Sequence, residues 1–105
     1  MPLTRPISQE QIELIAARFR VIGEPMRISL LDNMRDGECT VGELVAATGA
    51  SQQNVSKHLK VLHNAELISR RPAGRTVYYG IADETVFAIC EKVCDDAVRD
   101  QRSSS

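Results

Sequence analysis

The chain has 105 residues, of which 43% are hydrophobic, 26% charged and 4% aromatic, and its formal net charge is −1. These values are close to those of average globular proteins and exclude a disordered or low-complexity chain, so we expect one domain over residues 1–105, frayed at 1–7 and 101–105. No apolar run reaches the length of a membrane span, no secretory signal opens the chain, and three cysteines are too few for a disulfide framework, which favours the cytoplasm.

Two amphipathic helices are predicted at the start of the chain. Ser8 opens a capping box, and the helix that follows it carries apolar residues at spacings of three and four until Gly23 ends it. Pro25 suits the first position of a second helix, which runs to about Arg35 and stops at Gly37.

Two further helices follow, separated by a tight turn. Thr40 opens a second capping box for a short helix that ends near Gly49, and Ser51 is a natural cap for the next helix, which runs to about Ala65. Apolar residues of this fourth helix fall within one narrow arc, which must be its buried side. They are Val55, Leu59 and Leu62.

The hydrophobic period then changes from that of a helix to that of a strand. Residues 68–71 and 76–81 are strand-like, and residues 72–75 supply the turn between them. Asp83 caps a last helix that runs to about Arg99. Helix, turn, helix and basic hairpin, in that order, predict a mainly α fold of the winged helix-turn-helix class, with five helices and a two-stranded wing.

The fourth helix of a winged helix-turn-helix enters a DNA major groove. Opposite its buried arc it carries glutamine and serine, which can hydrogen-bond base edges, and lysine, which suits phosphates; arginines of the wing would reach the flanking backbone or a minor groove. The candidate DNA-binding residues are Ser51, Gln52, Gln53, Ser56, Lys57, Lys60, Arg70, Arg71 and Arg75. His58 lies at the edge of the buried arc, so we interpret it as a packing residue. A merely solvated polar face is the alternative, and only the ordered combination of elements favours DNA.

Charge is unevenly distributed along the chain. Residues 50–82 contain five basic residues and one acidic residue, whereas residues 83–100 contain six acidic and two basic ones. This distribution suggests a surface that faces a polyanion and a separate end that faces a partner. Chance clustering on a solvated surface explains the charges equally well.

Four stretches of the chain resemble the ArsR/SmtB family of bacterial repressors, within residues 10 to 100. They are FRVIGEPMRI (19–28), GECTVGEL (37–44), SQQNVSKHLKVL (51–62) and GRTVYY (74–79). The resemblance implies a homodimer whose first and last helices form the interface, consistent with a short chain that has few large side chains. It also implies binding to double-stranded operator DNA, and release when a metal, metalloid or thiol oxidant binds.

The family's metal sites are incomplete in this chain, and the fold requires no cofactor. Zinc sensors of the family use carboxylates and histidines of the last helix, where Asp83 and Asp96 stand at two such places but no histidine is present. Arsenic sensors often carry Cys-x-Cys at the start of the third helix, where this chain has Cys39 alone. Neither site transfers intact.

The three cysteines, Cys39, Cys90 and Cys94, are the remaining candidates for binding an effector. Cys90 and Cys94 are four residues apart and share one helix face. Three thiolates suit a soft ion such as As(III), Cd(II) or Pb(II), and two thiols suit a disulfide or sulfur-bridged link. Cys39, near a helix N-terminus, is predicted to have a lowered pKa and to be the better nucleophile. Simple packing of the cysteines in apolar surroundings, with no inducer, is an equal alternative.

Two other classes of protein compete with a repressor. An enzyme is disfavoured, because the chain has no Gly-rich phosphate loop, no metal-binding helix motif and no local signature for a Cys–His pair, so no catalytic residue is predicted. A dimeric protein-interaction module could keep the winged shape without binding DNA. Binding that weakens steeply with salt would distinguish a DNA-binding protein from such a module.

Overall fold

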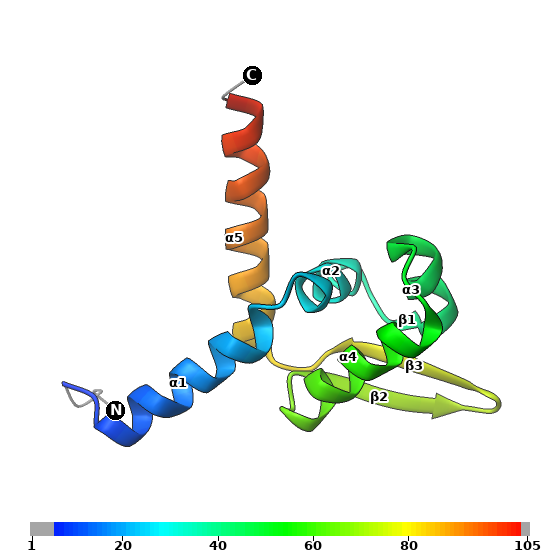
Figure 1. Cartoon of the computed structure of the whole chain (residues 1–105), viewed down its shortest axis with the longest axis horizontal. Helices are drawn as coiled ribbons and strands as arrows, with labels where there is room; N and C mark the ends of the chain where they lie inside the picture. Colours follow the sequence, from blue (N-terminus) through cyan, green and yellow to red (C-terminus); the bar gives the residue numbers. More distant parts are fainter. Residues whose placement is uncertain (1–5, 104–105) are drawn as a thin grey trace.

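The computed structural model describes residues 6–103, and side chains up to residue 98. Of the residues expected to fray, 1–7 and 101–105, positions 1–5 and 104–105 lie outside the described residues, whereas positions 101–103 continue the last helix. The five helices and three strands are α1 (Gln9–Ile22), α2 (Pro25–Asn33), β1 (Cys39–Thr40), α3 (Val41–Thr48), α4 (Gln52–Asn64), β2 (Ile68–Ala73), β3 (Thr76–Ile81) and α5 (Glu84–Ser103). Figure 1 shows α2, α3 and α4 gathered beside the sheet, with α1 and α5 extending away from them in different directions.

The predicted helix starts are confirmed by their caps. The Ser8 and Thr40 hydroxyls each accept a hydrogen bond from the third backbone N–H of the helix, and both capping boxes are complete. Ser51 Oγ accepts from the N–H of Asn54 at 3.1 Å and begins α4. Gly49 ends α3 in the left-handed conformation, with φ at 73°, and so turns the chain sharply into α4.

The sheet has three strands where the sequence predicts two. The order is β1-β3-β2, all antiparallel, with Cys39 opposite Tyr79 and Thr40 opposite Tyr78. A strand of two residues has no hydrophobic period to detect, which is why the sequence pattern misses it. The wing is also longer than predicted, because the ladder continues to the Ala73–Thr76 pair and leaves the turn to Gly74 and Arg75.

One apolar core joins all the elements between α2 and α5. Its buried members are Leu30, Leu31, Met34, Leu44, Val55, Leu59, Leu62, Leu67, Ile68, Val86 and Cys90. The arc predicted for α4 is confirmed, since Val55, Leu59 and Leu62 are at most 1% exposed.

The last helix is longer than predicted, ending at Ser103 instead of near Arg99. It begins as expected, because Asp83 Oδ1 accepts from the N–H groups of Thr85 and Val86. Within the described part of the chain, no helix combines the length and the apolar character needed to cross a bilayer.

Candidate nucleic-acid interface

Helix α4 turns its polar side to solvent along its whole length. Ser51, at its N-cap, and the five polar side chains predicted to face DNA are exposed. These five are Gln52, Gln53, Ser56, Lys57 and Lys60. Since the opposite side is anchored in the core by leucine and valine, the helix cannot rotate about its axis without exposing that apolar edge to water. The structure therefore presents two glutamines, two serines and two lysines on one surface.

Hydrogen bonds inside the molecule also hold α4 in place. His58 is buried, and its Nδ1 accepts a hydrogen bond from Arg27 Nε at 3.1 Å. The same guanidinium donates to the carbonyl oxygen of Val21, at 3.0 Å, and so joins α1, α2 and α4. His58 is therefore a packing residue with a satisfied ring nitrogen, as predicted, whereas the role of Arg27 was not visible in the sequence.

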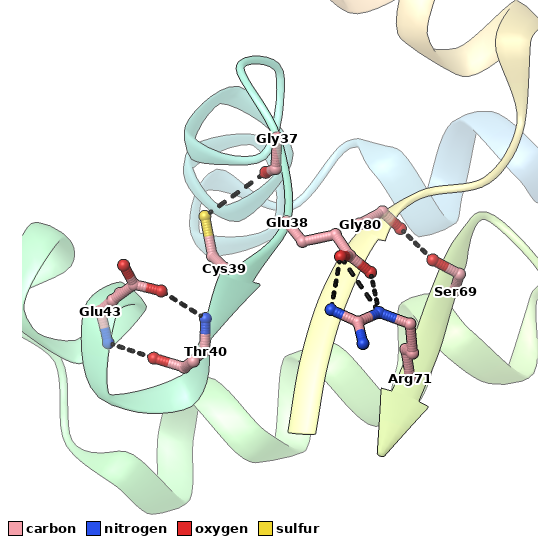
Figure 2. Close-up of polar contacts among 8 residues, drawn as sticks. All are labelled: Gly37, Glu38, Cys39, Thr40, Glu43, Ser69, Arg71 and Gly80. Atoms are coloured by element: carbon pink, nitrogen blue, oxygen red, sulfur yellow. Dashed lines mark hydrogen bonds and ion pairs between the residues drawn. The ribbon is translucent and has the colours of Figure 1, made fainter. Parts of the chain in front are cut away.

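The wing arginines are all exposed, but they differ in their surroundings. Arg75 lies at the hairpin turn, and Arg70 and Arg71 are neighbours in β2, so their side chains leave opposite faces of the sheet. Figure 2 shows Arg71 against Glu38, the residue before β1. Arg71 Nη2 donates to Glu38 Oε1 at 2.9 Å, and Arg71 Nε lies within 3.2 Å of both carboxylate oxygens.

Two further effects mark the Glu38–Arg71 pair. The hydrogen bonds from Arg71 hold the pKa of the Glu38 carboxyl below its usual value. The Arg71 guanidinium also lies over the ring of Tyr78, 4.7 Å from its centre. Glu38 was not among the predicted site residues, because 33 positions separate it from its partner and no local pattern connects the two residues.

The structure does not bring the three cysteines together within one protomer. Cys39 lies in β1, half-buried, and its thiol donates to the carbonyl oxygen of Asn33 at 3.4 Å. Cys90 lies in the core and Cys94 is half-buried one turn farther along α5. Among the described residues, no group of three or more cysteine, histidine or acidic side chains is arranged to hold a metal ion.

The predicted activation of Cys39 is wrong. Burial raises the pKa of the Cys39 thiol, and the nearby carboxylate of Glu43 raises it further. Glu43 is the capping-box residue of α3, so the helix N-terminus that was expected to favour the thiolate carries its own negative charge. Burial likewise raises the pKa of the Cys90 thiol, with a smaller contribution from Cys94.

An apolar groove lies between α1 and α5. Ile15, Phe19 and Ile22 line it from α1, and Val86 and Ile89 from α5. Phe19 is 56% exposed, and Val93, farther along α5, is 61% exposed. Large apolar side chains at this exposure on two adjoining helices are typical of a surface that contacts another protein.

Comparisons with known proteins agree with this geometry. The model of a family described as bacterial regulatory proteins of the arsR family matches residues 24–70. A transcriptional repressor SmtB homolog from Synechocystis sp. is 33% identical over 89 residues, which are 85% of this chain and 67% of that protein.

Solved structures share the fold over most of their length. The crystal structure of the AntR antimony-specific transcriptional repressor has a TM-score of 0.81 and 26% identity, covering 93% of this chain and 90% of that one. The homodimeric winged helix-turn-helix DNA-binding domain Mb0332 from Mycobacterium bovis has a TM-score of 0.73 and 26% identity, covering 91% of this chain and 92% of that one.

The raised thiol pKa values predict slow alkylation of the folded protein. At pH 7.5, Cys39 and Cys90 should react with iodoacetamide more slowly than in the urea-unfolded chain, because less thiolate is present and Cys90 is covered. Peptide mass mapping over time gives the rate for each cysteine. Faster reaction of Cys39 in the folded protein would contradict the raised pKa.

Proposed function

This chain belongs to the arsR family of bacterial regulatory proteins, and on that premise we propose that it is a homodimeric repressor that reads operator DNA with α4 and the wing. The observation that carries the proposal is the exposed polar face of α4, opposite an apolar edge fixed in the core. As a regulator of bacterial DNA, it would act in the cytoplasm.

The uncharged polar side chains and the lysines of α4 have different roles in the proposed recognition of DNA. Gln52, Gln53 and Ser56 can exchange hydrogen bonds with base edges, and a glutamine can bond an adenine through two atoms. Lys57 and Lys60 contribute point charges that suit phosphates, which set affinity and register without reading sequence. Arg70 and Arg75 would extend the phosphate contacts along the wing.

The α1 and α5 surfaces support a dimer through the first and last helices. The exposed apolar side chains of these helices include Ile12, Ile15, Phe19, Val93 and Val98. A second copy related by a two-fold axis would cover them, since the same surface on both subunits meets itself. Such a dimer would present two α4 helices to successive major grooves, about one helical turn apart.

A thiol-binding effector at Cys90 and Cys94 is the regulatory part of the proposal. Asp95 follows Cys94 directly, and its Oδ1 lies 3.0 Å from Arg35 Nη2 in the connection between α2 and β1. Cys90 packs in the same core as α4. A soft ion such as As(III), Cd(II) or Pb(II), or a reactive sulfur species, bound there would disturb these two contacts between α5 and the rest of the domain. Cys39 would join such a site only if a conformational change, or the pairing of two subunits, brings its thiol close to Cys90 and Cys94.

Lys57→Glu should weaken binding to every duplex sequence by about tenfold or more at physiological salt, because each half of a dimer loses a phosphate contact.

Gln53→Ala should mainly relax base preference, by about 1–3 kcal/mol of discrimination. Fluorescence anisotropy with an operator and a mixed-sequence duplex measures both effects. Unchanged affinity of Lys57→Glu would contradict the orientation of α4 on DNA, and salt-independent binding by the unmodified protein would favour a protein-interaction module.

Phe19→Glu should convert the dimer to a monomer, because it places a charge in the apolar groove between α1 and α5. Light scattering after size-exclusion chromatography measures the mass, and DNA affinity should fall with it, since a monomer binds only one half-site. Ile28→Glu, at an exposed apolar residue of α2, is the matched control and should remain dimeric. A Phe19→Glu dimer would place the interface elsewhere.

The Cys90→Ser/Cys94→Ser variant should stay on its operator under arsenite, cadmium or polysulfide concentrations that release the unmodified protein. The reason is that serine oxygen is a poor ligand for soft ions and forms no bond with sulfane sulfur. Mobility-shift assays with mass spectrometry of the protein give release and adduct together. Equal release of both proteins would leave the two cysteines as packing residues only.

A further inference from the structure

An acidic residue from outside the wing, Glu38, lies against the outer face of the wing. In the register of β1, β3 and β2, Ile68 and Tyr79 face the core. Ser69, Arg71, Tyr78 and Gly80 therefore share the opposite face, because strand residues alternate. Glu38 meets this face, since its carboxylate contacts Arg71 there (Figure 2).

The Glu38 carboxylate occupies the atoms with which Arg71 would bind a phosphate. A guanidinium binds carboxylate and phosphate through the same planar fork of N–H groups. Arg71 directs Nε and Nη2 at Glu38, at 2.9–3.2 Å, and its planar face rests on Tyr78. Its best-matched donors are therefore already used inside the chain.

The backbone around the pair keeps Glu38 in reach. Glu38 directly precedes β1, which is paired with β3. Glu38 lies so close to Gly80 that a Cβ atom added to Gly80 would lie 3.2 Å from Glu38 Cγ. The side chains of Arg71 and Glu38 are 55% and 40% exposed, so the bond is open to exchange with a competing anion.

Arg70 provides an internal comparison. It is the preceding residue of the same strand, it is exposed, and it has no carboxylate partner among the described residues. The two arginines are adjacent in β2 but leave opposite faces of the sheet, and only Arg71, on the outer face, is neutralised by a carboxylate.

We propose that Glu38 acts as an internal substitute for a phosphate and withholds Arg71 from DNA, so that Arg70 and Arg75 alone supply the phosphate contacts of the wing. This inference rests on the proposed function, because it assumes that the wing lies on DNA. It assigns Glu38 a positioning role that lowers affinity and makes the protein depend more on the contacts of α4.

The test is the salt dependence of binding to a fixed duplex. One added phosphate contact steepens the slope of log K against log salt by about 0.9, which is about 3.5-fold in affinity over a fourfold salt range, per wing. Glu38→Gln should show this steepening with tighter binding at low salt. The same substitution in an Arg71→Gln background should not steepen the slope, because no arginine is present at position 71 to be released. Arg70→Gln alone should make the slope shallower by about the same amount.

Asp36→Asn is the matched control, since it removes one exposed negative charge two residues before Glu38. A gain in Glu38→Gln no larger than in Asp36→Asn would overturn the proposal, since the effect would then be general electrostatics. Loss of affinity in Glu38→Gln, with unchanged thermal unfolding, would also overturn it and make Glu38 a brace that holds the wing in its DNA-binding position. If the unmodified protein shows no salt-dependent binding, the proposed function itself fails, which is a separate result.

Discussion

The structure depends on the burial of one edge of α4. Val55, Leu59 and Leu62 lie at the centre of the core, where they contact leucines from the neighbouring elements. Removing such side chains from water contributes roughly 1.5–3 kcal/mol each, so no other rotation of the helix competes. Everything proposed about DNA follows from this constraint, because a helix with one edge fixed inside the protein has its opposite edge fixed outside.

The interface is not simply a collection of positive charges. Lys57, Lys60, Arg70 and Arg75 are exposed and have no carboxylate partner in the described part of the chain, whereas Arg71 is bonded to Glu38. An exposed ion pair of this kind contributes little to stability, about 0–1 kcal/mol. Its effect on binding can be larger, because it decides whether a charge is available to the phosphates. The electrostatics of the wing therefore depend on pairing as well as on composition.

Helix α5 belongs to two environments at once. At its start, Val86 and Cys90 are buried with the residues that support α4, while Val93 and Val98 expose apolar surface farther along. The Arg35–Asp95 bond ties the middle of the helix to the connection between α2 and β1. If the dimer forms through α1 and α5 as proposed, a change at the interface could reach α4, because α5 also packs in the core that holds α4.

The helices, most of their caps, the buried edge of α4 and the exposed candidates for DNA binding could all be predicted from the amino-acid sequence. Each of these depends on residues within about one or two turns of one another, where periodicity and capping act locally. Four features could be seen only in the folded chain: β1 adds a third strand, Arg27 bonds His58, burial and Glu43 raise the pKa of Cys39, and Glu38 neutralises Arg71. Apart from the contribution of Glu43, these features arise from burial or from groups that are far apart along the chain. The packing of the whole core sets the distance between two such groups, and no local sequence pattern contains that information.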